Sequence, residues 1–151
     1  MNPSPASQVS APAPVGGQAD LLFYDGSCGL CHGVVKFVIA RDREGAHFRF
    51  APLQGATFRG RYAEAERAEL PDSVVLWTVD GRTLVRARAV LQIGERLGGA
   101  WRVLAQAASL LPVWLLDWVY DGIARMRHHL FARPGSTCPL LPPDLRGRFL
   151  P

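Results

Sequence analysis

The period of the hydrophobic positions changes several times along the first third of the chain, and each change predicts an element. LLFY at 21–24 is a short apolar run stopped by Asp25-Gly26, which indicates a buried strand ending in a turn. The segment 31–44 carries apolar residues without alternation and closes with charges, so it predicts a helix buried on most sides. HFRFAPL at 47–53 alternates and predicts a second strand, ended by Pro52.

The middle of the chain predicts another helix and then a hairpin. Residues 55–70 are polar and rich in Arg, Glu and Ala, with apolar positions at helical spacing. Two β-branched runs then flank Asp80-Gly81, a strong signal for a tight turn between antiparallel strands. We expect Val74–Val79 to pair with Thr83–Arg86.

One more amphipathic helix completes the predicted core. Ala87–Leu97 has helical spacing and is followed by Gly98-Gly99, which should end it. We expect its inward side chains to be Val90, Leu91, Ile93 and Leu97. The predicted order is β-α-β-α-β-β-α, the element order of a thioredoxin-like α/β fold.

The residues after the predicted core have a different composition. The stretch from Val103 to Tyr120 is strongly apolar but is interrupted by Gln106, Pro112 and Asp117, so it is not a continuous membrane span. One interpretation is two helices that meet at Pro112 and pack their tryptophans on the domain or on a partner. The other is a helix on a membrane surface, because three tryptophans lie near a basic cluster. These residues are Trp101, Trp114, Trp118, Arg125, Arg127, His128 and His129.

Length and composition indicate a single domain with flanking segments. The chain has 151 residues and is 48% hydrophobic, enough for one core. We expect a disordered Pro/Ala/Ser/Gly-rich tail over 1–19, a thioredoxin-like core over 20–100, and a Trp-rich helical extension over 101–151 that packs on the core. The prolines of the tail interrupt any secretory signal, so we expect a cytoplasmic protein.

The net charge of +4 does not indicate a nucleic-acid partner. Seventeen basic residues, all arginine except Lys36, are spread over most of the chain and interleaved with acids in its middle third. A nucleic-acid site would need a clustered basic face. We therefore interpret the charge as solvated surface.

The candidate chemistry lies in YDGSCGLCHG at 24–33, where two cysteines flank Gly29-Leu30. In a reducing compartment such a pair indicates redox or metal chemistry rather than a structural disulfide. Cys28 falls at the start of the predicted helix, where unpaired N–H groups stabilise a thiolate. Cys31, one turn later on the same face, can resolve a mixed disulfide formed at Cys28. This chemistry needs no bound cofactor.

Two neighbouring residues each have a functional and an ordinary interpretation. Asp25 could accept a proton during resolution if it is buried, although an Asp before Gly commonly bonds its own backbone in a turn. His32 could add positive charge next to Cys31, or it could be a histidine on the helix surface.

The same letters allow two further chemistries. CGLCH also matches the attachment signature of c-type haem, with His32 and Met126 as axial candidates, but haem attachment normally takes place outside the cytosol. Cys28, Cys31 and Cys138 with one histidine could bind zinc, although Cys138 has no second cysteine beside it. A lone late cysteine is commonly a small buried hydrophobe.

The chain resembles the DCC family of thiol-disulfide oxidoreductases, named for an Asp and two Cys. The resemblance covers nearly everything from Leu21 onward, and its motifs stand in order from YDGSCGLC at 24–31 to the end. The others are RFAPLQG at 49–55, DSVVLW at 72–77, RARAVLQIGERLGG at 86–99, VYDGIARMRHHLF at 119–131 and STCPLLPPDLRGRFL at 136–150.

The resemblance implies a thioredoxin-like domain whose catalytic residues are Asp25, Cys28 and Cys31. Gly26 and His32 are supporting positions in this motif, and Cys138 falls on a recurring C-terminal pattern that suggests a place near the pair. The expected partners are a disulfide-bearing protein or small-thiol substrate and a thiol reductant.

The chain departs from thioredoxins proper at their substrate-docking proline. No proline stands directly ahead of Val74, because Pro71 is a few residues early and Ser73 takes the place. This departure argues against substrate docking of the thioredoxin kind.

Overall fold

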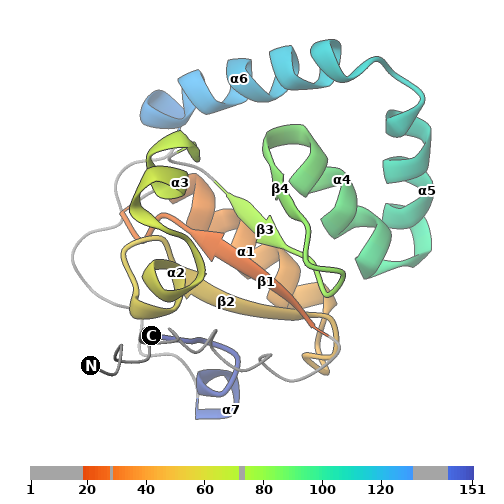
Figure 1. Cartoon of the computed structure of the whole chain (residues 1–151). Coiled ribbons are helices and arrows are strands. Elements are labelled where there is room, and N and C mark those ends of the chain that lie inside the picture. Colours follow the sequence, from red (N-terminus) through yellow and green to blue (C-terminus); the bar gives the residue numbers. More distant parts are fainter. Residues whose placement is uncertain (1–18, 28, 72–73, 131–142) are drawn as a thin grey trace, which may run out of the picture.

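The protein is built around a mixed β-sheet in which the first strand occupies a central position (Figure 1). The computed structural model describes residues 19–27, 29–71, 74–130 and 143–151. Within them the strand order is β2-β1-β3-β4. The strands are β1 (Asp20–Tyr24), β2 (Phe48–Pro52), β3 (Val75–Trp77) and β4 (Thr83–Val85).

The sheet contains one parallel and two antiparallel strand pairs, as the predicted fold requires. β1 runs parallel to β2, with Leu22 opposite Phe50, and antiparallel to β3, with Leu22 opposite Leu76. β4 runs antiparallel to β3, which confirms the hairpin predicted around Asp80-Gly81. Gly81 has φ +79° in its turn, a conformation that favours glycine. The thioredoxin-like fold is confirmed.

Helices cover both faces of the sheet because the strands bury side chains on both (Figure 1). Helices α1 (Gly29–Arg41) and α4 (Arg86–Leu97) cover one face, and α2 (Ala56–Arg61) covers the other, where α3 (Glu64–Glu69) follows it. The core on the α1/α4 side consists of Leu22, Cys31, Val35, Val38, Phe48, Phe50, Val74, Leu76, Ala89 and Ile93. The core on the α2 side consists of Leu21, Phe23, Ala51, Phe58, Tyr62 and Val75.

Two sequence predictions about the middle of the chain are wrong in detail. The helix expected over 55–70 is broken between α2 and α3, where Tyr62 and Ala63 take extended backbone angles. Tyr62 is buried against Phe23 and Phe58, so packing competes with helix continuation. In α4, Val90 is 48% exposed instead of inward, because Ala89 and Ile93, four residues apart, define the buried stripe.

Two further helices form an arm beside the core. Helix α5 (Gly99–Ser109) follows α4 through Gly98 and Gly99, whose φ values of +71° and +55° allow the chain to reverse. A Cβ at Gly94 would lie 3.0 Å from the Cβ of Ala105, so α4 and α5 pack closely. Helix α6 (Val113–Leu130) then runs across the top of the view in Figure 1.

One tryptophan of these two helices packs on the core, and two are exposed to solvent. Trp101 packs edge-on against Phe37 of α1, with ring centroids 4.8 Å apart, whereas Trp114 and Trp118 are 72% and 73% exposed. Among the described residues no single helix has the length and apolar character to cross a membrane. Helix α5 and residues 113–126 of α6 reach that length and apolar character only when they are taken together, and the two segments are bent by 118° relative to each other.

The C-terminal residues return to the open edge of β2. The short helix α7 (Pro143–Arg146) precedes them. The Phe50 N–H donates to the Arg148 carbonyl at 2.8 Å, and the Leu150 N–H donates to the Phe50 carbonyl at 2.8 Å. The C-terminal segment is therefore joined to β2 by backbone hydrogen bonds, and Phe149 stacks on Phe50.

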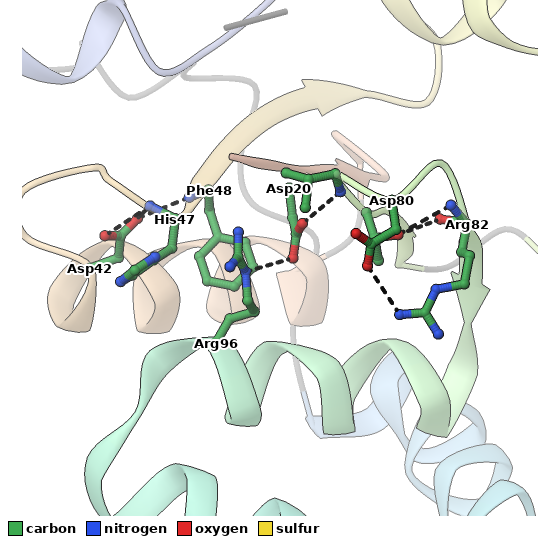
Figure 2. Close-up of polar contacts among 9 residues, drawn as sticks. Asp20, Asp42, His47, Phe48, Asp80, Arg82 and Arg96 are labelled. Carbon is green, nitrogen blue, oxygen red and sulfur yellow. Dashed lines mark hydrogen bonds and ion pairs between the residues drawn. The ribbon is translucent and has the colours of Figure 1, made fainter. Parts of the chain in front are cut away.

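Two buried aspartates connect distant segments (Figure 2). Asp20 accepts from the Val79 N–H at 2.9 Å and from Arg96 Nε at 3.2 Å, which joins β1 to the hairpin turn and to α4. Asp42 accepts from the Phe48 N–H at 3.1 Å and from Arg148 Nη2 at 2.8 Å. Burial lowers the pKa of Arg148, and Asp42 counteracts that shift.

Asp42→Ala should destabilise the protein more than Arg148→Met. Asp42→Ala leaves the buried guanidinium of Arg148 without its carboxylate partner. It also removes the acceptor for the N–H groups of Ala46, His47 and Phe48. We expect a loss of about 3–5 kcal/mol in the free energy of unfolding. Arg148→Met leaves Asp42 with those backbone donors, so the loss should be smaller. Urea titrations of both variants measure the difference, and equal losses would contradict this account.

Candidate functional site

The dithiol motif lies where the chain leaves the carboxyl end of β1. β1 ends at Tyr24, the segment Asp25–Ser27 turns, and α1 begins at Gly29, the residue after Cys28. The prediction of a strand, a turn and a helix around the motif is confirmed. Cys28 itself lies outside the described residues.

Asp25 holds the turn that precedes the motif. Its Oδ1 accepts hydrogen bonds from the Ser27 N–H at 2.9 Å and from the Ser27 hydroxyl at 2.7 Å. This is the side-chain-to-backbone pattern of an Asx turn. Asp25 is half-buried. Its contacts match the turn interpretation of this residue, and Gly26, the next residue, is exposed within the same turn.

Gln54 is a site residue that the sequence did not single out. Its Nε2 donates to Asp25 Oδ1 at 3.2 Å from the loop between β2 and α2. The Leu53 N–H in the same loop donates to the Tyr24 carbonyl at 2.9 Å. The loop that follows β2 therefore supports the turn that follows β1. In the sequence, the signal for Gln54 was its position in the motif RFAPLQG. Its separation from Asp25 along the chain gives no indication that the two side chains are in contact.

Cys31 is buried, with 3% of its surface exposed, and belongs to the core on the α1/α4 side of the sheet. It is the third residue of α1. Val74, which precedes β3, belongs to the same core, so the segment after Ser73 enters the sheet beside the hydrophobic environment of this cysteine. A thiol in this position is shielded from bulky reagents and from large substrates. Ser73 lies outside the described residues, and Pro71 is half-buried.

His32 packs on aromatic rings that lead to the C-terminal segment. Its ring lies edge-on to Tyr24 with centroids 6.0 Å apart, and Tyr24 lies edge-on to Phe149 at 6.3 Å. His32 is half-buried rather than fully on the helix surface. The C-terminal segment thus reaches the neighbourhood of the motif through Phe149, a residue that the sequence analysis did not identify. Cys138 lies outside the described residues.

The part of the chain that the structure describes contains no group of three or more His, Cys, Asp and Glu side chains placed to hold a metal ion. The zinc set proposed from the sequence includes Cys28 and Cys138, both outside that part. Met126, the haem candidate, is 53% exposed on α6.

Comparison with known proteins identifies the class. A family model described as DCC1-like thiol-disulfide oxidoreductase matches residues 22–133. The chain belongs to this family, as its motifs suggested, and the family name indicates a thiol-disulfide oxidoreductase-like function.

Two relatives illustrate the breadth of the family. The chain is 33% identical over 135 residues to the uncharacterized protein YuxK of Bacillus subtilis, an alignment that covers 87% of this chain and 93% of YuxK. It is 30% identical over 116 residues to the chloroplastic DCC family protein At1g52590 of Arabidopsis thaliana. This alignment covers 77% of this chain and 67% of that protein. No solved structure matches the chain.

Replacing Asp25 by Ala should destabilise the turn more than replacing it by Asn. Asparagine keeps an oxygen that can accept from Ser27 and Gln54, and alanine does not. We expect Asp25→Ala to lower the free energy of unfolding by about 1–2 kcal/mol and Asp25→Asn by roughly half of that or less. Equal losses in thermal or urea unfolding would show that the carboxylate charge, not its hydrogen bonds, supports the site.

Proposed function

We propose that the protein is a thiol-disulfide oxidoreductase that uses Cys28 and Cys31 as a dithiol/disulfide couple. The observation that carries the proposal is the start of α1 one residue after Cys28, with Cys31 buried in its first turn. The first N–H groups of a helix have no partners within the helix and carry partial positive charge, so they favour a thiolate at its start. Family membership supports the same class of activity.

The proposed reaction divides two roles between the cysteines. The Cys28 thiolate attacks one sulfur of a substrate disulfide, the substrate S–S bond breaks, and the departing thiolate takes a proton from solvent. Cys31 then loses its proton and attacks the Cys28 sulfur, which releases the second substrate thiol. The substrate gains two electrons and the protein ends with a Cys28–Cys31 disulfide, which an external thiol reductant reopens.

The surrounding residues support this division. The burial of Cys31 suits a resolving thiol, which meets only the neighbouring sulfur, better than an attacking one. Asp25 acts mainly as a positioning residue for the turn, with Gln54 behind it. We assign His32 a packing role against Tyr24. The proposed partners are a disulfide-bearing protein or small disulfide and a cellular thiol reductant, in a compartment reducing enough to reopen the couple.

Single cysteine variants test the proposed roles. Cys28→Ser should abolish reduction of a small aromatic disulfide, because it removes the attacking sulfur. Cys31→Ser should retain the first attack but stop turnover, leaving one equivalent of substrate thiol bound through a mixed disulfide that mass spectrometry detects. Val90→Ala, an exposed change on α4, is the control and should turn over like the unchanged protein.

Metal content distinguishes the alternative. If the purified protein carries stoichiometric zinc and its thiols resist oxidation, the cysteines form a metal clip and the redox proposal fails. A mixed disulfide that forms at Cys31 in the Cys28→Ser variant would instead reverse the two roles.

A further inference from the structure

The arm formed by α5 and α6 exposes large apolar side chains that no described segment covers. On α5 they include Val103 and Leu104, which are 65% and 58% exposed, and at the bend between the helices Leu110 is 86% exposed. On α6 Trp114 and Trp118 are 72% and 73% exposed, and Met126 is 53% exposed. In Figure 1 the arm lies on the outside of the molecule, beyond α4 and β4.

Helix α6 directs its two acidic residues toward the domain and leaves large apolar side chains exposed on its outer side. Asp117 faces a cleft toward the core that Arg86 and Arg88 also line, and Asp121 pairs with Arg86 Nη1 at 3.8 Å. The tryptophans point away from the domain. A surface helix normally turns its apolar face to the core and its charged face to water. Here the acids are directed toward the core, which leaves an apolar outer face suited to a second apolar phase.

The charges of the arm favour an anionic phase. Over 99–126 the basic residues are Arg102 and Arg125, both exposed, and the acidic residues are the two that face α4. Arg102 lies at the rim of a cleft that Glu95 of α4 also lines, whereas Arg125 is near the far end of the described part of α6. The sequence continues with Arg127, His128 and His129. A second copy of the chain would set this basic face against an equally basic one, since an isologous contact pairs a surface with itself. Anionic lipid headgroups complement it, and tryptophan is the side chain that favours the boundary between headgroups and acyl chains.

We propose that the outer face of α5 and α6 binds the surface of an anionic membrane. The 118° bend between the helices and the length of each fit an arm that lies in the interface rather than one that crosses it. Trp114, Trp118 and the bend at Leu110 enter the boundary region, while Arg102 and Arg125 remain at the headgroups. This inference does not depend on the redox chemistry.

Cosedimentation of the full chain with vesicles tests the proposal. The protein should bind phosphatidylcholine vesicles that contain about a quarter phosphatidylglycerol, and bind pure phosphatidylcholine more weakly. Trp114→Ala/Trp118→Ala should reduce the partition coefficient roughly tenfold or more. Arg102→Gln/Arg125→Gln should reduce binding to the anionic vesicles by about fivefold for each arginine and change binding to neutral vesicles little.

The matched control is Val79→Ala, which removes an exposed apolar group in the turn between β3 and β4 and should bind like the unchanged protein. Circular dichroism and the melting temperature measure whether each variant is folded. We expect all of them to fold, because the substituted residues are exposed. A blue shift of tryptophan fluorescence on adding anionic vesicles, absent in Trp114→Ala/Trp118→Ala, would support insertion of these side chains.

Three results would overturn the proposal. The first is failure of the unchanged protein to sediment with anionic vesicles, and the second is an equal loss of binding in the valine control. The third is a dimer in sedimentation equilibrium that Trp114→Ala/Trp118→Ala converts to monomer while vesicles bind neither protein. The outer face would then be a contact between copies of this chain.

Discussion

The position of the first helix relative to the first strand is the constraint on which the site depends. α1 must begin within a few residues of the end of β1, so the intervening turn is short and needs its own hydrogen bonds. Asp25 supplies them through Ser27, and Gln54 adds one from the loop after β2. Because both loops follow parallel strands, the register of β1 with β2 sets the place where the helix starts. The chemistry proposed for Cys28 is a consequence of that start.

The far end of the chain reinforces the same strands. Arg148–Pro151 runs along β2 and is anchored by the buried pair of Arg148 and Asp42. Phe149 stacks on Phe50 and touches Tyr24, which in turn packs on His32. Residues at opposite ends of the sequence therefore share one aromatic cluster beside the dithiol motif. The segment after α7 is part of the domain that positions the site rather than a detached tail.

Local sequence signals predicted the elements that local physics determines. The apolar run before Asp25-Gly26 and the two runs around Asp80-Gly81 fold as strands, since turn residues at both places limit the alternatives. Sequence reasoning failed where contacts between distant residues decide. The burial of Tyr62 against Phe23 breaks the helix expected over 55–70, and the inward stripe of α4 excludes Val90. For the candidate site, the sequence singled out Asp25 and Cys31, whose catalytic roles stay predictions, but not Gln54 or Phe149, whose places arise from tertiary contact. Cys28, Ser73 and Cys138 stay predictions, as do the boundaries at 19 and 100.

The central claim is that the start of α1 stabilises a thiolate at Cys28, and the pH dependence of its alkylation tests this most directly. The rate of iodoacetamide modification at Cys28, followed by peptide mass spectrometry in Cys31→Ser, reports the thiolate fraction at each pH. The account predicts a midpoint clearly below the pKa of about 8.5 found for free cysteine. A midpoint at or above that value would mean that the helix start gives no electrostatic support to the thiolate, and the proposed oxidoreductase mechanism would lose its basis.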